Sequence, residues 1–163
     1  MIVLGIDPGI AIVGYGIIEY NGNKFKAIDY GVITTKSDQP YPQRLKEIYL
    51  SMDSLIKKYK IDAVAIEELF FSKNVKTAIG VSHARGVLVL CSELNGCPTY
   101  EYTPLQVKQG ICGYGRADKR QVQEMVKIIL GLEKIPRPDD AADALAVAIS
   151  HCHTSRFSEI FRA

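Results

Sequence analysis

The chain opens with a short apolar run that ends on a carboxylate. Residues 2–6 favour a buried strand, Asp7 stands where this run stops, and Pro8 and Gly9 force the backbone to change direction. Turn chemistry alone can account for Asp7, because aspartate commonly begins a turn. A carboxylate at the end of a buried strand is nevertheless unfavourable unless a positive charge meets it. We therefore interpret Asp7 as a candidate ligand for a divalent metal ion.

The periodicity of the rest of the chain predicts a meander followed by alternating helices and strands. Apolar and β-branched runs predict further strands over residues 10–20, 24–35, 62–67 and 99–102, with a hairpin at Asn21-Gly22-Asn23. Helical spacing predicts helices over residues 43–60, 75–95, 104–110, 118–130 and 139–152, capped by Thr103 and Asp118 and stopped by Gly96 and Gly110. These elements make an α/β fold with a five-stranded mixed sheet flanked by helices. We expect one domain over residues 1–155 and a C-terminal tail over residues 156–163.

The acids that end two of the predicted strands belong to one site. A right-handed crossover places the strand over residues 62–67 beside the first strand. Asp7 and Glu67 then leave adjacent parallel strands at the same edge of the sheet.

The last predicted helix is apolar nearly all round except for three aspartates. Chemistry at the start of a helix explains Asp139 and Asp140 well, but it explains Asp143 poorly, because Asp143 lies past the first turn among alanine and leucine. Residues three or four apart share a helix face. Either Asp140 with Asp143 or Asp139 with Asp143 can therefore point at the sheet edge, and the spacing does not choose between these pairs.

Together these residues form a set of carboxylates from three separate segments. Several carboxylates in one pocket repel each other unless cations lie among them. Oxygen ligands without cysteine or histidine favour Mg²⁺ or Mn²⁺. Two such ions about 3.5–4 Å apart can activate a water molecule and stabilise the leaving oxygen of a phosphodiester. The predicted chemistry is phosphodiester hydrolysis.

Composition places the chain among compact proteins without a membrane span. The 163 residues are 47% hydrophobic, and no apolar run reaches the length that a membrane-spanning helix needs. Met1 leads directly into the first strand, so we expect no secretory segment. The four cysteines have no C-x-x-C spacing, which argues against a zinc knuckle. We expect a cytoplasmic protein with reduced thiols.

The charges are unevenly distributed along the chain. The formal net charge is only +2, but residues 69–90 contain three basic residues and no acid, and residues 103–137 contain seven basic residues and three acids. Two basic stretches in a nearly neutral chain can present a surface that binds a polyanion. Solvated helix faces are the competing interpretation, which composition does not exclude.

Several motifs in one order resemble the RuvC family of Holliday-junction resolvases, from Met1 to about His153. They are Ile6-Asp7-Pro8-Gly9, Gly14-Tyr15-Gly16, Ala65-Ile66-Glu67, Lys73-Asn74, Ala84-Arg85-Gly86, Gln106-Val107-Lys108-Gln109 and residues 140–146. The resemblance implies a ribonuclease H-like fold and a homodimer that cuts four-way DNA junctions with Mg²⁺ or Mn²⁺. It implies paired symmetric nicks during recombination and repair, alongside proteins of a branch-migration complex. It also implies that Asp140 and Asp143 are the two helix acids and that Glu67, rather than Glu68, is the strand acid.

The resemblance assigns further residues to DNA. Phe70 matches an aromatic residue beside the junction centre, where its ring can stack on an unpaired base, although core packing is the alternative. Lys108 and Lys119 match basic residues near the scissile phosphate, and Lys119 also begins a helix, where an anion is favoured. Further expected contacts with the DNA backbone are Lys73, Lys76, Arg85 and Arg116.

Other interpretations are weaker or stay open. An actin-like phosphotransferase needs two such domains and a second phosphate loop, and a junction-binding module without catalysis would not need four acids. The glycines at positions 14 and 16 either let DNA approach the backbone or accommodate a twisted strand. Small apolar residues in the helix over 75–95 can pack either against a second copy of the chain or against the sheet.

Overall fold

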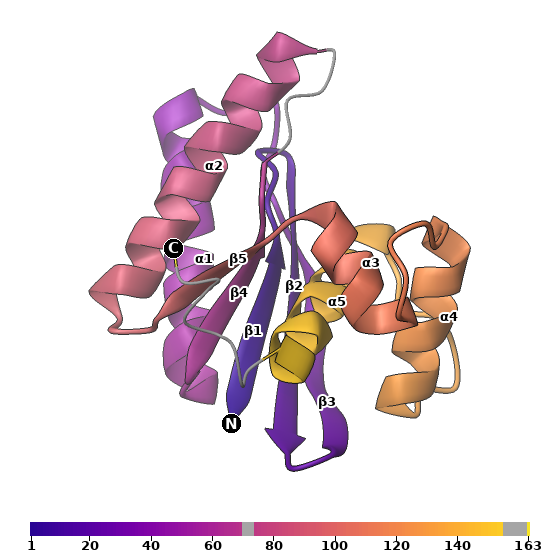
Figure 1. Ribbon diagram of the computed structural model, residues 1–163. Helices are drawn as coiled ribbons and strands as arrows, with labels where there is room; N and C mark the ends of the chain where they lie inside the picture. Colours follow the sequence, from indigo (N-terminus) through magenta and orange to yellow (C-terminus); the bar gives the residue numbers. More distant parts are fainter. Residues whose placement is uncertain (70–73, 155–162) are drawn as a thin grey trace.

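A mixed sheet forms the centre of the computed structural model, which describes residues 1–69, 74–154 and 163. Within these residues five strands stand in the order β3-β2-β1-β4-β5 (Figure 1). The strands are β1 (Ile2–Asp7), β2 (Ile12–Asn21), β3 (Lys24–Thr34), β4 (Ala63–Glu67) and β5 (Thr99–Tyr102). The helices are α1 (Tyr41–Tyr59), α2 (Val75–Leu94), α3 (Pro104–Cys112), α4 (Lys119–Leu130) and α5 (Asp139–Thr154). The α/β class and the five-stranded mixed sheet predicted from the sequence are confirmed.

The register of the sheet brings the first and fourth strands together, as the crossover rule predicts. β1 runs parallel to β4 with Ile6 opposite Ile66, and antiparallel to β2 with Asp7 opposite Gly14. Asp7 and Glu67 each follow the Ile6–Ile66 pair by one residue. Because side chains alternate between the two faces of a sheet, these two acids lie on the same face.

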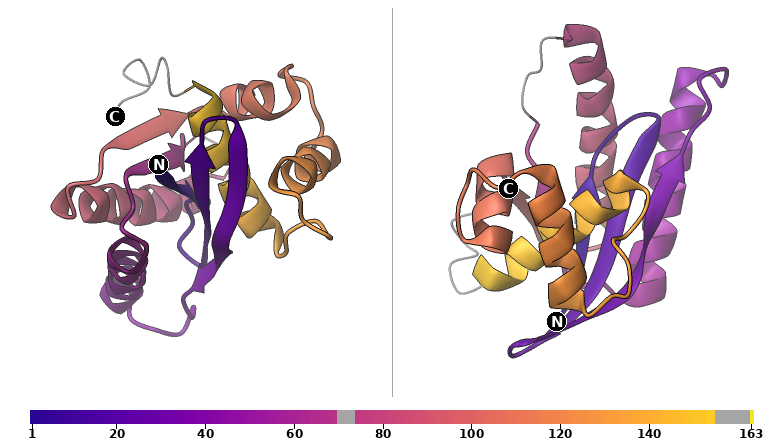
Figure 2. Two further views of the ribbon diagram at one scale, coloured as in Figure 1. Left: turned by 90° about the horizontal axis from the view of Figure 1, so that it is seen from below. Right: turned by 90° about the vertical axis from the view of Figure 1, so that its right-hand side faces the viewer.

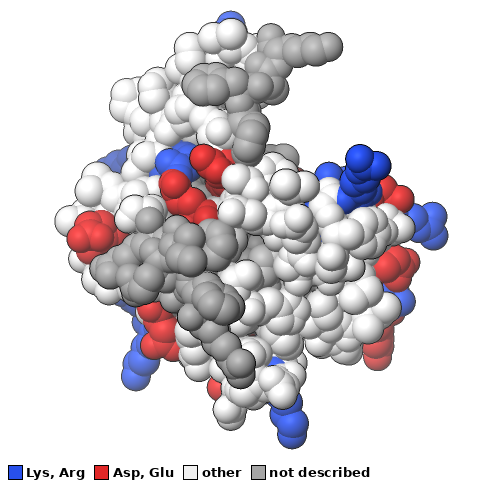
Figure 3. Space-filling model, viewed as in Figure 1, with Lys and Arg blue, Asp and Glu red and all other residues white. Residues whose placement is uncertain are grey.

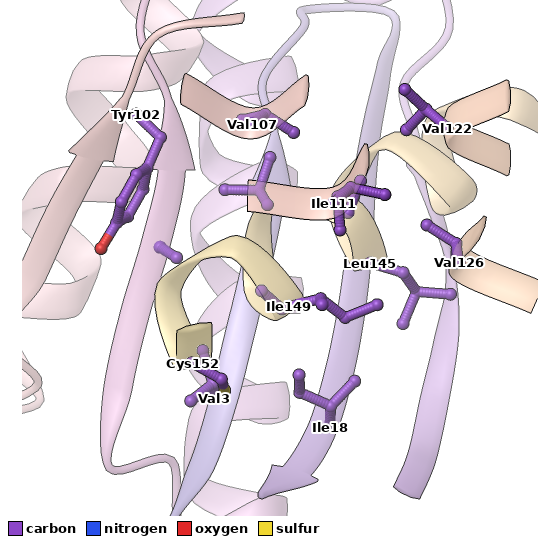
Figure 4. Packing of buried hydrophobic residues seen from close by; sticks show 14 of the residues in the cluster. Val3, Ile18, Tyr102, Val107, Ile111, Val122, Val126, Leu145, Ile149 and Cys152 are labelled. Carbon is purple, nitrogen blue, oxygen red and sulfur yellow. The ribbon is translucent and has the colours of Figure 1, made fainter. Parts of the chain in front are cut away.

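Helices cover the sheet on both faces and create two cores (Figures 1 and 2). α1 and α2 pack on one face, over Leu4, Ile6 and Ile66. α3, α4 and α5 pack on the other face, where Val3 and Ile18 of the sheet contact the helices (Figure 4). The helix residues of that second core include Val107, Ile111, Val122, Val126, Leu145 and Ile149.

α5 lies directly on the backbone of β1 and β2. A Cβ atom at Gly5 would overlap the carbonyl oxygen of Ala144, and a Cβ atom at Gly14 would overlap that of Asp140. At Gly16 a Cβ atom would lie 2.7 Å from the Leu145 side chain. These glycines therefore serve close packing of a helix on the sheet, which differs from both interpretations made from the sequence. The contact sets the height of the first turn of α5 above the sheet.

The helix caps agree with the sequence, whereas one predicted helix end is wrong. Thr103 and Asp118 cap α3 and α4 through capping boxes. The predicted stop at Gly110 is wrong, because α3 continues to Cys112 and ends at Gly113, which has a φ of 80°. Gly110 lies where α3 packs closely on α5: a Cβ atom at this position would lie 2.8 Å from the Ser150 hydroxyl oxygen, so glycine here serves the contact between the helices.

Two further expectations concern the termini and the membrane. The predicted tail over residues 156–163 lies outside the described residues except for Ala163, so the domain boundary stays a prediction.

Among the described residues, no helix combines the length and the apolar character needed to cross a bilayer.

Candidate active site

Three elements bring the predicted acids to one edge of the sheet. Asp7 and Glu67 end β1 and β4 on the same face. The backbone of Asp140 lies against Gly14, which is paired with Asp7 across the sheet, so the first turn of α5 begins beside Asp7. Asp143 follows on the next turn of the same helix. Chain segments that are far apart in sequence therefore converge as the sequence predicts.

The electrostatics of this edge follow from burial and from the proximity of like charges. Burial, together with the charges of Glu67, Asp143 and Asp140, raises the pKa of Asp7 to about 8, against the opposing effect of Lys119. Burial and Asp143 likewise raise the pKa of Glu67 to about 6, against the opposing effect of Lys108 and Lys119. Burial also raises the pKa of Asp143, although Lys119 opposes this. The carboxylates therefore form one interacting group that favours added positive charge.

Two lysines stand beside the acids. Lys108 from α3 and Lys119 from α4 line a hollow of about 210 Å³ together with Glu67 and Asp143. The Lys119 ammonium nitrogen lies 3.7 Å from Oδ2 of Asp143. Burial would lower the pKa of Lys119, but the nearby carboxylates, led by Asp143, outweigh burial and raise it. Both predicted phosphate-binding residues are thus placed next to the predicted acids.

Glu67 lies in the wall of a second hollow as well. This hollow, also of about 210 Å³, is bounded by Asp7, Pro8, Glu68 and Val81 among others. Val107 and Val147 also line the first hollow, whereas Asp7 lines the second. Glu67 is therefore shared by both hollows.

The donor set fits a hard divalent cation by its chemistry, because every donor is a carboxylate oxygen and the burial of these groups disfavours uncompensated negative charge. In the described ranges, no three acidic, histidine or cysteine side chains already form a group able to hold a metal ion.

The remaining predicted DNA contacts are placed differently from one another. Lys76, in the first turn of α2, and Arg116, in the loop before α4, are exposed. Arg85 is half-buried and forms an ion pair with Glu101 of β5. Phe70 and Lys73 lie outside the described residues. The role of each of these residues in binding DNA stays a prediction.

The charge distribution on one face agrees with this arrangement. In Figure 3 acidic side chains gather just below the upper grey segment, with basic side chains next to them. Further basic side chains project from the right-hand margin, where Figure 1 places α4. Acidic side chains thus lie beside basic ones near the upper grey segment, whereas both kinds alternate along the right-hand margin.

Sequence reasoning missed two ion pairs in the surroundings of the site. Asp139 accepts the Lys119 ammonium at 3.2 Å, and Glu101 pairs with Arg85. Neither partnership follows a local spacing, because 20 and 16 residues separate the partners in sequence. The close contact between α5 and the sheet could have been predicted from the sequence, because glycines recur in β1 and β2 and alanines recur in α5.

The raised pKa of Asp7 predicts that Asp7→Asn stabilises the protein when divalent cations are removed. Between pH 3.8 and about 8 the Asp7 carboxyl keeps its proton in the folded protein but loses it in the unfolded chain. The contribution of Asp7 to folding stability is therefore complete below pH 3.8 and is lost as the pH rises through about 8. Asparagine carries no charge and avoids this loss. One pKa unit corresponds to about 1.4 kcal/mol, so we expect a gain of at least about 2 kcal/mol at pH 8.

Thermal unfolding of both proteins in chelator at pH 5 and pH 8 checks this prediction. The difference between variant and parent should be larger at pH 8, and a difference that is equal at both values contradicts the assignment of a raised pKa.

A mixed sheet whose edge gathers carboxylates from β1, β4 and α5 defines a ribonuclease H-like nuclease. The chain belongs to the family described as crossover junction endodeoxyribonuclease RuvC, whose family model matches residues 3–151. The RuvC protein of Alkaliphilus metalliredigens is 64% identical over 162 residues, which cover 99% of each chain.

Solved structures agree with this assignment. A structure of Thermus thermophilus RuvC has a TM-score of 0.93 and 36% identity, with 100% of each chain covered. A structure of T. thermophilus RuvC in complex with a Holliday junction substrate has a TM-score of 0.95 and 35% identity, and it covers 100% of this chain and 99% of the other. The recognition of the family and of a ribonuclease H-like fold from sequence motifs is confirmed.

Proposed function

We propose that this protein is a cytoplasmic endonuclease that resolves four-way DNA junctions by paired symmetric nicks during homologous recombination and DNA repair. The observation that carries this proposal is the convergence of Asp7, Glu67, Asp140 and Asp143 at one sheet edge beside two lysines. The likeness to a RuvC structure in complex with a Holliday junction substrate supports the choice of substrate.

The four acids are proposed as the ligands of two Mg²⁺ ions per active site, with Mn²⁺ able to substitute. Bound there, such ions supply an activated water and stabilise the leaving oxygen of the phosphodiester. Asp7 and Glu67 are fixed by the strand register, and Asp140 and Asp143 by the contact of α5 with the sheet. The protein's own contribution is to hold these carboxylates at a set spacing on rigid elements.

Positive side chains around the acids are proposed to bind the DNA backbone. Lys108 and Lys119 line the hollow that contains Glu67 and Asp143, so a scissile phosphate at the acids would contact both ammonium groups. Lys119 is the first residue of α4, where backbone N–H groups add to the attraction for a phosphate. The more distant contacts proposed are Phe70, Lys73, Lys76, Arg85 and Arg116.

A homodimer is proposed because a four-way junction requires two symmetric cuts, which two sites related by a two-fold axis can supply. α2 supports this proposal, since it exposes an apolar stripe whose large members are each more than half exposed: Val75, Ile79, Leu90 and Leu94. Exposed apolar patches of this kind mark interaction surfaces. The molar mass in solution checks the dimer, and proteins of the branch-migration complex are the further partners proposed.

The experiment that tests the function compares a synthetic four-way junction with a linear duplex of the same sequence, in Mg²⁺ and in chelator. We expect symmetric nicks in the junction with Mg²⁺, and neither cutting of the duplex nor cutting in chelator. Tight junction binding without any cutting would instead favour a binding module that lacks catalysis.

Replacing Lys108 with alanine should weaken the dependence of junction binding on salt. Each phosphate contact contributes about one unit to the slope of log K against log salt, so the variant should lose about one unit of slope. Binding measured at several salt concentrations checks this, with Lys127→Ala on the far part of α4 as the matched control. A slope and a cutting rate that both match the parent would place Lys108 outside the DNA contact.

A further inference from the structure

Asp139 is the first residue of α5 and precedes the proposed ligand Asp140, yet the proposed function assigns it no role. Its carboxylate has partners on both oxygens. Arg137 and the Gln123 amide nitrogen donate to Oδ1, the latter at 3.3 Å, and the Lys119 ammonium lies 3.2 Å from Oδ2. Gln123 is buried on α4. The carboxylate is therefore held from two directions and keeps one oxygen for Lys119.

Lys119 is shared between two carboxylates at unequal distances. Its nitrogen lies 3.2 Å from Oδ2 of Asp139 and 3.7 Å from Oδ2 of Asp143. The Lys119, Asp139 and Asp143 side chains are 58%, 43% and 34% exposed, so water screens these pairs and they contribute little to folding stability. The two ion pairs therefore determine the position of the Lys119 ammonium and have little effect on the free energy of unfolding.

The position of the ammonium decides whether Asp143 is available. A lysine that pairs fully with Asp143 neutralises this carboxylate and competes with any cation that approaches it. Asp139, which also pairs with Arg137, gives Lys119 a nearer partner than Asp143. Without the Asp139 charge, Asp143 is the carboxylate to which the ammonium would move.

We propose that Asp139 is a positioning residue, which draws the Lys119 ammonium toward itself, weakens its pairing with Asp143 and so leaves the Asp143 carboxylate more available to a divalent cation. The inference rests on the proposed function in one respect, the role of Asp143 as a cation ligand. It adds a residue outside the four proposed ligands and assigns a purpose to the contacts that Arg137 and Gln123 make with Asp139.

The test is the binding of Mn²⁺ to the full-length protein without DNA, followed by calorimetry, for Asp139→Asn and its parent. We expect Asp139→Asn to weaken the affinity for Mn²⁺ about fivefold, an effect of the size that one exposed ion pair can have. Arg137→Gln, which removes one of the two donors to Oδ1, should change the affinity in the same direction by a smaller factor. Glu133→Gln is the matched control for loss of one negative charge on an exposed residue before α5.

The same pair of proteins in a Lys119→Met background separates positioning from simple charge. If Asp139 acts through Lys119, then Asp139→Asn leaves the affinity for Mn²⁺ unchanged in this background. A fivefold loss that persists without Lys119 overturns the proposal, because it shows a direct effect of the Asp139 charge. An affinity that is unaffected in both backgrounds also overturns it, even where the melting temperature falls.

The design keeps this inference separate from the proposed nuclease function. Mn²⁺ binding is measured without DNA, so a parent protein that binds the ion but leaves junctions uncut refutes the function and still tests Asp139. A parent that cuts junctions while Asp139→Asn binds Mn²⁺ normally refutes the inference alone. With junction DNA, the concentration of Mg²⁺ that gives half-maximal cutting should rise about fivefold for Asp139→Asn, with the maximal rate changed less.

Discussion

Asp7→Asn is expected to abolish junction cutting while the protein still binds the junction. Asp7 ends the central strand β1, and burial together with the neighbouring acids raises its pKa to about 8, so a bound cation would stabilise its charged form. Asparagine keeps the shape but loses the charge that attracts the ion. We expect the cutting rate to fall by at least about 10²- to 10³-fold, comparable to the loss of one group that stabilises transition-state charge.

The measurement pairs single-turnover cutting with a binding assay on the same junction. Junction affinity should stay within a few-fold of the parent, because the Asp7 carboxylate offers no hydrogen-bond donor or positive charge to a phosphate. Glu68→Gln is the matched control, since Glu68 follows the strand acid and is exposed. Cutting at the parent rate by Asp7→Asn would remove the basis of the site assignment.

Gly14→Ala is expected to impair both folding and cutting through one displaced helix. The added methyl group would overlap the carbonyl oxygen of Asp140, so α5 must move away from β2. Overfilling a packed interior typically reduces the free energy of unfolding by about 1–3 kcal/mol. A shift of about 1 Å in catalytic groups can reduce the rate about 10²-fold, and here both Asp140 and Asp143 would move.

Chemical unfolding and cutting rates of the folded variant check this expectation. Gly86→Ala is the control for stability, because a Cβ atom at that exposed helical position meets no atom within 4 Å and alanine favours a helix by up to about 1 kcal/mol. A Gly14→Ala protein with the stability and cutting rate of its parent would show that α5 does not depend on direct contact with the sheet backbone.

The sequence predicted the site because its geometry follows from general rules. Alternation along strands and the handedness of crossovers were enough to place Asp7 beside Glu67, and the register with Ile6 opposite Ile66 agrees. Helical spacing left two pairs of aspartates open, and only the family motif selected Asp140 with Asp143. The choice of those residues as catalytic groups stays a prediction that the Asp7 variant tests first.

What the sequence did not reveal depends on contacts between distant segments. Gly110 resembles a helix stop until the Ser150 side chain is seen against it, and the glycine facing Asp140 resembles a flexible strand residue until α5 is present. The partner of Lys119 at Asp139 lies 20 residues away, so no local spacing signals it. Each of these features depends on which segments pack together in the folded protein, and local sequence patterns do not carry that information.

The exposure of Glu67 to two hollows determines how the site can be filled. Glu67 lines both hollows although the strand residues before it are buried, so small ions have two hollows through which to approach this carboxylate. We expect the loading rate to be set by the release of water from the ion, which is slow for Mg²⁺. Faster loading by ions that dehydrate more readily would then occur with the protein already in its working shape.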